Sequence, residues 1–258
     1  MLEELVAGAV ADASARRTVR SLADVEADAL AARPALDALS ALSPAGRVKL
    51  IAEVKRASPS RGVLAEIRDP AGLAVSYQTG GASAISVLTE GRRFGGSLDD
   101  LAQVRAAVDI PVLRKDFIAE PYQVFEARAA GADLVLLIVA ALEQQRLAEL
   151  HELIVQLGMA PLVETHSAEE VQRALDVGAA IVGVNARNLS TFELDRDLFG
   201  TLADRIPSGV IRIAESAVKE PADVAHYRAA GADVVLVGEA LVTGEDPVGT
   251  LESFLVAS

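Results

Sequence analysis

Two ionisable side chains lie within a short, otherwise apolar stretch near the start of the chain. In I-A-E-V-K-R-A-S-P-S-R-G, residues 51–62, Glu53 and Lys55 alternate with apolar residues before a Ser-Pro-Ser turn ends the run. In later stretches a polar residue again stands two positions after an apolar residue or a glycine, at Lys115, Glu164, Asn185 and Glu215. Ammonium and carboxylate groups held together supply the acid and the base of general acid–base catalysis.

The strength of such an arrangement follows from Coulomb's law. Opposite charges about 6 Å apart at an effective dielectric near 20 interact by roughly 3 kcal/mol. This energy shifts protonation by about two pKa units before burial is counted. Each polar residue alone could instead cap a helix or pair at the surface. The five stretches together favour a functional cluster, if the fold brings them to one place.

The elements that would position these residues form a regular alternation. A sequence motif recurs four times, in which Gly-Ala is followed by an apolar run rich in β-branched residues. Its glycines are Gly81, Gly131, Gly178 and Gly231, at intervals of 50, 47 and 53 residues. Each motif is typical of a helix that ends at glycine and leads into a strand. Four further apolar runs, at 48–54, 110–114, 160–164 and 209–214, bring the number of expected strands to eight.

Helices are expected between these strands, at 98–107, 121–130, 142–157, 168–177 and 220–230. Several follow good helix starters, which are Ser97, Glu120-Pro121, Ser167 and Glu220-Pro221. Eight βα units with strands apolar on both faces predict an α/β fold, a (β/α)₈ TIM barrel. We expect one domain over 1–258, with a helical N-terminal extension over 1–45 and the barrel over 46–258.

In such a barrel, alternate residues of each strand face the interior. The lower, apolar member of each pair would fill the barrel, and the later, polar member would reach its carboxyl-terminal mouth, where barrel active sites lie. The turns after the last two expected strands, A-E-S-A (214–217) and V-G-E-A (237–240), contain Ser216, Gly238 and Glu239. This is the usual place for a phosphate, bound by backbone N–H groups.

Other polar residues carry weaker signals. His151, His166 and His226 lack a spacing that gathers metal ligands, and we expect them to be solvated surface residues. Ser58 and Ser60 flank Pro59 and could simply form a turn. Arg92-Arg93 is expected to be a solvated pair in a loop that faces the mouth.

Composition excludes several classes of protein. The chain has no cysteine, which removes disulfides, thiolate metal sites and cysteine nucleophiles and favours a cytoplasmic location. Its longest apolar run, 134–142, is about half of a membrane span. A net charge of −13 with 3% aromatic residues argues against a nucleic-acid partner. We expect a monomer that acts on a small phosphorylated molecule, away from membranes and nucleic acid.

Six motifs resemble one family in particular. I-A-E-V-K-R-A-S-P-S-R-G, V-L-R-K-D-F, P-L-V-E-T-H, V-G-V-N-A-R-N-L, I-A-E-S and V-L-V-G-E-A-L occur in the order typical of the indole-3-glycerol phosphate synthase family. The resemblance extends from about residue 4 to the end of the chain. It implies a barrel enzyme of tryptophan biosynthesis with no metal and no organic cofactor. The implied reaction converts 1-(o-carboxyphenylamino)-1-deoxyribulose 5-phosphate to indole-3-glycerol phosphate, CO₂ and water.

The resemblance also implies roles for the mouth residues. Lys115 would be the general acid, Glu164 a second acid or base, and Lys55 an electrostatic group or a later acid. The orienting residues would be Glu53, Asn185, Glu215 and Ser216. For lysine to serve as an acid near neutral pH, its pKa must be lowered or its proton must be directed.

Substrate-binding residues follow from the same resemblance. Arg187 would bind the substrate carboxylate or phosphate, with Ser58, Gly238 and Glu239 nearby. The apolar slot for the anthranilate ring would consist of Pro59, Leu113, Phe117, Leu136 and Leu189. The family commonly has Glu-Ser-Gly after the seventh strand, where this chain has Ala217. We expect Ala217 to have an ordinary, negative φ and to donate its N–H to the phosphate.

Three alternatives are weighed against this assignment. A phosphoribosyl isomerase of the same architecture would need an acid and a base but not the second lysine. A Schiff-base lyase would use Lys115 as a nucleophile. A non-catalytic phosphosugar-binding protein would have no reason to hold both lysines and Glu164.

Overall fold

Eight parallel strands close into a barrel in the computed structural model, which describes residues 1–188 and 191–257. Around the barrel the strands follow the order β1-β10-β9-β8-β7-β6-β5-β4, and β4 pairs with β1 to close it. Their bounds are β1 Lys49–Val54, β4 Ala84–Leu88, β5 Val112–Lys115, β6 Leu134–Ile138, β7 Ala160–Thr165, β8 Ile181–Asn185, β9 Ile211–Glu215 and β10 Val234–Val237. The expected (β/α)₈ barrel is confirmed.

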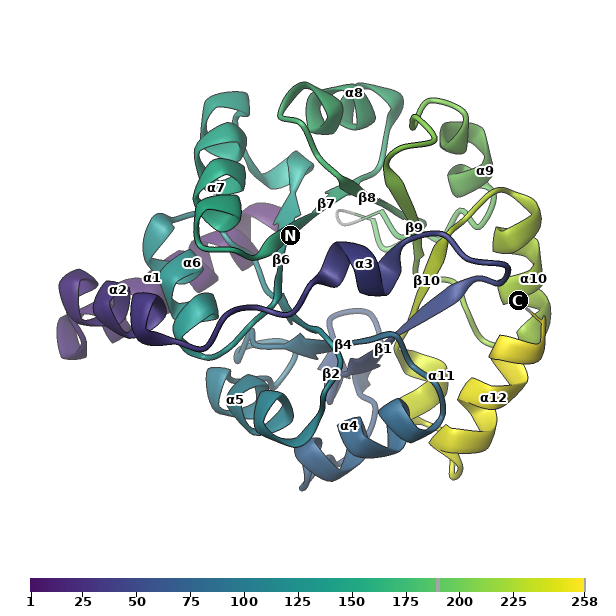
Figure 1. The fold of residues 1–258 in the computed structure, drawn as a ribbon, viewed down its shortest axis with the longest axis horizontal. Helices are drawn as coiled ribbons and strands as arrows, with labels where there is room; N and C mark the ends of the chain where they lie inside the picture. The colour runs from purple at the N-terminus through teal and green to yellow at the C-terminus, as the bar shows by residue number, and fades with distance from the viewer. Residues whose placement is uncertain (189–190, 258) are drawn as a thin grey trace.

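Helices surround the strands as an outer ring (Figure 1). Those between strands are α4 Pro70–Thr79, α5 Leu98–Ala107, α6 Pro121–Ala129, α7 Gln144–Gln156, α8 Ala168–Asp176, α9 Leu198–Ala203 and α10 Pro221–Ala229. A 3-10 turn, η1 (Val139–Ala141), precedes α7, and α11 (Glu239–Val242) and α12 (Pro247–Ala257) follow β10. A small antiparallel hairpin, β2 (Ala57–Ser58) with β3 (Gly62–Val63), follows β1.

The helix starts are determined locally. The hydroxyls of Ser97 and Ser167 accept the backbone N–H three residues later, from Asp100 and Glu170. Before α6 and α10, Glu120 and Glu220 form capping boxes, and the following proline takes the first helical position. The starters expected from the sequence therefore begin these helices.

Side chains of opposite parity separate two apolar regions. Ile51, Leu113, Leu162 and Ile213 belong to the cluster inside the barrel, with Leu136 and Leu236. The intervening strand residues, such as Leu50 and Val163, belong to the larger cluster between strands and helices. Because strand side chains alternate, the residues two positions beyond the interior apolar layer lie at the mouth.

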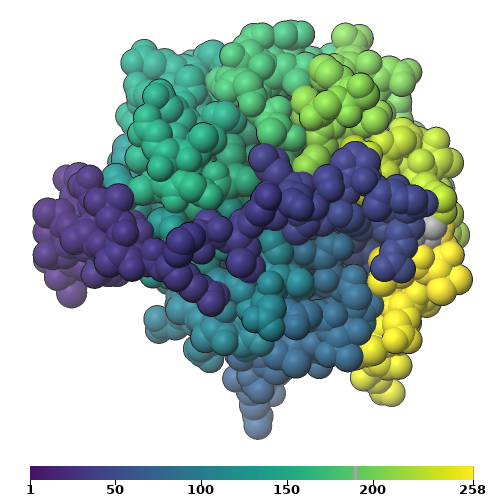
Figure 2. Space-filling model, in the orientation of Figure 1, coloured from purple at the N-terminus to yellow at the C-terminus, as the bar shows by residue number. Residues whose placement is uncertain are grey.

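The N-terminal segment contacts both ends of the barrel. It contains α1 (Leu2–Val19), α2 (Leu22–Ala31) and α3 (Ala38–Leu42). Helix α3 lies across the amino-terminal end of the strands, and in the space-filling view this segment runs as a band across that face (Figures 1 and 2). Leu42 belongs to the cluster inside the barrel, and Lys49 Nζ donates to the Ala41 carbonyl at 2.8 Å. Helix α2 packs on α6, and α1 reaches the mouth.

No helix in the described part of the chain has both the length and the apolar character needed to cross a membrane.

The lower end of the barrel provides a stability test. Leu42 is fully buried under the strands, whereas Leu39 on the same helix is 42% exposed. Leu42→Ala should lower the free energy of unfolding by about 2–5 kcal/mol, because it leaves a cavity in the barrel floor. Leu39→Ala, the matched control, should change it by no more than about 0.5 kcal/mol. Urea denaturation of both variants measures this, and equal effects would mean that α3 does not seal the barrel.

Candidate active site

A cavity of about 1190 Å³, its open mouth included, lies at the carboxyl-terminal end of the strands. It is lined by all seven residues expected to take part in catalysis, which are Glu53, Lys55, Lys115, Glu164, Asn185, Glu215 and Ser216. Eight residues expected to bind substrate also line it: Ser58, Pro59, Phe117, Leu136, Arg187, Ala217, Gly238 and Glu239. Residues from seven strands or the loops after them therefore meet in one place.

Two expected substrate-binding residues are placed differently. Leu113 does not line the cavity: it is fully buried in the apolar layer inside the barrel, two positions below Lys115. A side chain at that depth supports the floor of the mouth and has no open surface for a ligand. Leu189 lies outside the described residues.

Lys115 is the centre of the charged cluster. Its Nζ lies 2.5 Å from Glu215 Oε2 and 3.5 Å from Glu164 Oε2. The side chain is 14% exposed, and those of Glu215 and Glu164 are 1% and 2% exposed. Ion pairs this far from water interact much more strongly than surface pairs, because solvent screens them little.

This enclosure shifts several pKa values. Burial alone would lower the pKa of Lys115, but Glu215, Glu164 and Glu53 outweigh it and raise that pKa well above its ordinary value. Lys115 therefore holds its proton until a stronger base develops beside it. For Lys115 to act as an acid, either its pKa is lowered or its proton is directed to the substrate, and the structure favours the second.

The two carboxylates beside Lys115 have pKa values shifted in opposite directions. Burial, with the Glu164 carboxylate adding to it, raises the pKa of Glu215 to about 7 despite the opposing ammonium of Lys115. Burial also acts to raise the pKa of Glu164, but Lys115 and His166 outweigh it and keep that pKa below its ordinary value. Near neutral pH the pair can therefore hold a proton between two carboxylates that titrate together.

A second ion pair lies beside the first. Lys55 Nζ contacts Glu53 Oε1 at 2.9 Å, and the Ser86 hydroxyl donates to Glu53 Oε2 at 3.3 Å. A Cβ on Gly238 would lie 2.6 Å from Glu53 Oε1 and 3.0 Å from Lys55 Nζ. Gly238 thus leaves room for this ion pair. The sequence suggested a different reason for glycine here, namely that its backbone approaches a phosphate.

Strand β8 makes room for Glu215 in the same way. A Cβ on Gly183 would lie 2.1 Å from Glu215 Oε1. Two residues further along β8, Asn185 Oδ1 accepts the Ser216 hydroxyl at 2.8 Å and the Arg187 N–H at 3.0 Å. The amide of Asn185 is thereby fixed near Glu164, where it contributes to lowering the pKa of that carboxyl.

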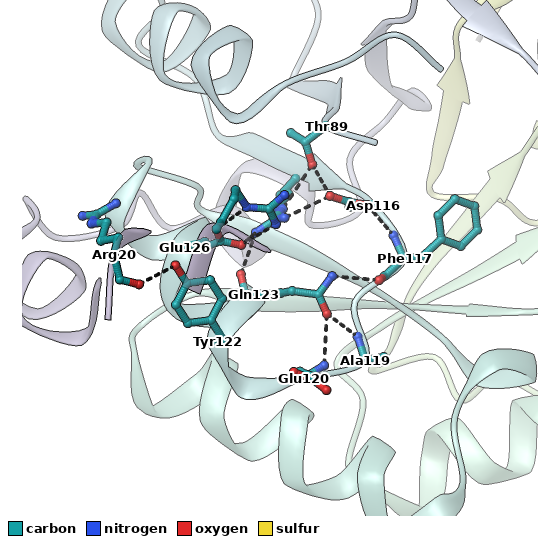
Figure 3. Close-up of polar contacts among 11 residues, drawn as sticks. Arg20, Thr89, Asp116, Phe117, Ala119, Glu120, Tyr122, Gln123 and Glu126 are labelled. Carbon is teal, nitrogen blue, oxygen red and sulfur yellow. Dashed lines mark hydrogen bonds and ion pairs between the residues drawn. The ribbon is translucent and has the colours of Figure 1, made fainter. Parts of the chain in front are cut away.

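The backbone on both sides of Lys115 is held by a buried polar network behind the strand (Figure 3). The fully buried Arg114 donates to Asp116 Oδ2 at 2.9 Å, to Thr89 Oγ1 at 3.1 Å and to the Gln123 carbonyl at 2.6 Å. Asp116 Oδ1 accepts the Phe117 N–H at 2.8 Å. Lys115 thus points into the mouth from between two residues anchored in the opposite direction.

This network continues into the N-terminal helix. Glu126 on α6 lies 3.7 Å from Arg114 Nη1 and accepts two hydrogen bonds from Arg16 of α1, at 2.5 and 2.8 Å. Helix α1 is also tied to the loop after β4, because Arg92 pairs bidentately with Asp12. Arg92, expected to be solvated, is thus about half exposed but paired.

The turn after β9 departs from expectation. Ser216 and Ala217 have φ values of 69° and 59°, both in the left-handed region. The expectation that Ala217 has an ordinary φ is therefore wrong. Alanine is strained here because its Cβ approaches the following carbonyl oxygen, which glycine avoids. Beside this turn, Arg61 Nη2 pairs with Glu239 Oε1 at 2.9 Å, and Arg187 and Lys219 line the same cavity.

His166 also departs from expectation. Its side chain is only 14% exposed, with Nε2 3.5 Å from Glu164 Oε1 and Nδ1 3.3 Å from Glu170 Oε2. The lack of a metal-ligand spacing led us to expect a solvated residue, but His166 directly follows β7, which ends at Thr165, and its imidazole faces Glu164 from beside the mouth cavity. The parity rule applied to Glu164 would have identified it, since the two residues are two positions apart.

Sequence reasoning also missed several apolar residues that line the cavity, among them Leu5 and Phe94. Leu5 comes from α1, and Phe94 from the loop after β4, with its ring centroid 6.1 Å from that of Phe117. An aromatic residue in a loop on the mouth side of a barrel could have drawn attention to Phe94. No local signal marks Leu5, because its place depends on how α1 packs.

Within residues 1–188 and 191–257, no group of three or more His, Cys, Asp or Glu side chains is arranged to hold a metal ion.

The barrel with acid and base groups at its carboxyl-terminal mouth defines a (β/α)₈ enzyme of acid–base chemistry. A family model described as indole-3-glycerol phosphate synthase matches residues 2–254. The chain belongs to the indole-3-glycerol phosphate synthase family, a family of carboxy-lyases in tryptophan biosynthesis. The family, the function and the enzyme class expected from the sequence are confirmed, and the isomerase alternative is not supported.

Named relatives match this chain over nearly their whole length. An indole-3-glycerol phosphate synthase of Leifsonia xyli subsp. xyli is 74% identical over 254 residues, covering 98% of this chain and 97% of that protein. One of Mycobacteroides abscessus is 59% identical over 257 residues, covering 100% of this chain and 94% of that protein. Among solved structures, a 3-hexulose-6-phosphate synthase has a TM-score of 0.65 at 20% identity, covering 81% of this chain and 99% of that one. That likeness shows the fold alone.

Because the turn at Ala217 is strained, a glycine at this position should make the protein more stable. Ala217→Gly should raise the free energy of unfolding by about 1 kcal/mol, because relief of left-handed strain exceeds the added unfolded-state entropy. The matched control Ala148→Gly, at an exposed site in α7, should instead lower it by about 1 kcal/mol. Thermal or urea unfolding of both variants decides this, and destabilisation by Ala217→Gly would show that the turn is not strained.

Proposed function

We propose that the mouth converts 1-(o-carboxyphenylamino)-1-deoxyribulose 5-phosphate to indole-3-glycerol phosphate, with Lys115 as the general acid. The observation that carries this assignment is the ammonium of Lys115 within 2.5 Å of Glu215 and 3.5 Å of Glu164, with the Lys55–Glu53 pair in the same cavity. Incubating the protein with this substrate and following indole fluorescence tests the activity directly.

The first step is ring closure. The aromatic carbon that bears the carboxylate attacks the ketone carbon, and the ketone oxygen takes a proton from Lys115 Nζ. The developing alkoxide is a stronger base than the Glu215 and Glu164 carboxylates, so a lysine with a raised pKa still gives up its proton to it. The carbon–carbon bond to the carboxylate then breaks, and its electron pair restores the aromatic ring as CO₂ leaves.

The second half of the reaction is dehydration. The new hydroxyl takes a further proton and leaves as water, and a base removes a proton from the adjacent methylene carbon to complete the indole. Glu164, beside a proton-sharing Glu215, is suited to the exchange of these protons, and Lys55 to stabilising charge or acting as the later acid. Glu53, Asn185, Glu215 and Ser216 orient the sugar and these groups.

The two ends of the substrate need different surroundings. Arg61, Arg187 and Lys219 line or border the side of the cavity next to the turn after β9, and they supply positive charge in a chain with a net charge of −13. The phosphate would bind there, with backbone N–H groups of Ala217 and Gly238. Pro59, Phe117 and Leu136, with Phe94, would form the slot for the anthranilate ring, above Leu113.

Removal of the acid is the direct test of the mechanism. Lys115→Ala should lower kcat by about 10²–10⁴, because the ketone oxygen loses its proton donor. Lys115→Arg should not restore activity, because a guanidinium hardly releases a proton. Arg146→Ala, at an exposed site on α7, is the control and should retain full activity. Near-normal turnover in Lys115→Ala, with an unchanged circular dichroism spectrum, would remove Lys115 from the mechanism.

We further propose a monomer in the cytoplasm. The lack of cysteine supports a cytoplasmic location. A monomer is supported by the scatter of exposed large apolar side chains, since no helix or strand among the described residues carries more than one. Sedimentation equilibrium should give a mass of 26.9 kDa. A concentration-independent mass of twice this value would contradict the proposal.

A further inference from the structure

His166 lies between two carboxylates, one in the mouth and one outside it. Its Nε2 faces Glu164 Oε1 at 3.5 Å, and Nδ1 faces Glu170 Oε2 at 3.3 Å. Nε2 of His166 and Oε1 of Glu164 are both buried and have no hydrogen-bond partner among the described residues. A slight approach of the two atoms would complete a hydrogen bond that neither makes at present.

The ring is held from the Glu170 side. Glu170 Oε2 also accepts the backbone N–H of His166 at 2.7 Å, and the Glu170 N–H is bound by Ser167 at the start of α8. Burial alone would lower the pKa of His166, but Glu170 and Glu164, with a contribution from Glu215, raise it above its ordinary value. These carboxylates come from α8, β7 and β9, and the carboxylates of Glu193 and Asp195, in the segment after β8, line the hollow beside the imidazole.

A hollow outside the mouth borders the same imidazole. It is lined by His166 and Asn185, and by Glu193, Leu194, Asp195 and Leu198 in the segment after β8. Glu164 is not among its lining residues, whereas His166 is not among those of the mouth cavity. His166 therefore separates the hollow from Glu164.

The proposed reaction requires a supply of protons to the buried acid groups, and His166 lies where it can provide one. Two protons are added to the ketone oxygen before it leaves as water, and one is returned from the methylene carbon. With the substrate carboxylate ionised, each turnover therefore consumes one proton from solvent. Bound substrate covers the mouth, and the side chain of Glu164 is only 2% exposed, so the acid groups need another path to that proton.

We propose that His166, oriented by Glu170, is a proton relay that recharges Glu164 from the hollow outside the mouth. The imidazolium gives its Nε2 proton to Glu164 Oε1 and becomes neutral, with the remaining proton on Nδ1. Rotation of the ring then presents the free nitrogen to water in the hollow, which restores the imidazolium. The inference rests on the proposed function, because it needs Glu164 to exchange protons during turnover.

The test uses the full chain and the carboxyphenylamino substrate. His166→Ala and His166→Gln should lower kcat by about tenfold or more and leave KM within about twofold, because proton delivery and not binding is lost. Added imidazole should restore much of the kcat of His166→Ala. His151→Gln is the matched control, since its Nε2 is also buried without a partner among the described residues but it lies outside both cavities.

A second variant tests the relay through its pH dependence. The relay needs the imidazolium, so kcat should fall as pH rises through the pKa of His166. Glu170→Gln removes a group that raises this pKa and should move that fall to lower pH, while His166→Gln should abolish it.

The outcomes separate the relay from a structural role. Unchanged kcat in both His166 variants would overturn the proposal. So would a loss of kcat that imidazole does not restore, or a higher KM together with a lower melting temperature. If instead the unmodified protein forms no indole product, the proposed function fails, and that failure is distinct from failure of the relay alone.

Discussion

The burial of one ammonium group among three carboxylates is the constraint on which the rest of the mouth depends. Lys115 and the side chains of Glu53, Glu164 and Glu215 are removed from water, which costs several kcal/mol for each ion unless the charges are closely paired. Close pairing in turn requires space. Gly183 and Gly238 provide it, because a Cβ at either position would overlap a carboxylate oxygen. The charge cluster thus explains why glycine, an uncharged residue, stands at positions 183 and 238.

The same strand that presents Lys115 also anchors it. Side-chain alternation points Arg114 and Asp116 away from the mouth, into a network that reaches Thr89, Glu126 and Arg16. Two charged systems therefore lie on opposite faces of β5, separated by its backbone. Groups held this firmly need little rearrangement when charge develops on the substrate, which is the main way in which such sites stabilise a transition state.

The acidic character of the chain gives the few cations at the mouth their significance. A net charge of −13 disfavours an anionic substrate at long range, so binding must depend on cations close to it. Arg61, Arg187 and Lys219 meet this need on one side of the cavity, while Lys55 and Lys115 are engaged by carboxylates at its centre. In the proposed function, the cations at the side of the cavity bind the substrate and the two lysines at its centre serve proton transfer, although Arg61 is itself paired with Glu239.

The sequence by itself determined the barrel, the starts of its helices and the acidic and basic residues at the centre of the mouth. These follow from local rules, since strand alternation, capping residues and βα order act over a few positions. Only the tertiary structure decided that Leu113 supports the floor, that Ala217 is left-handed, that Gly238 makes room for an ion pair and that His166 faces Glu164. Each of these depends on atoms brought close by packing between different strands and loops. No pattern within a single segment records the distance between them.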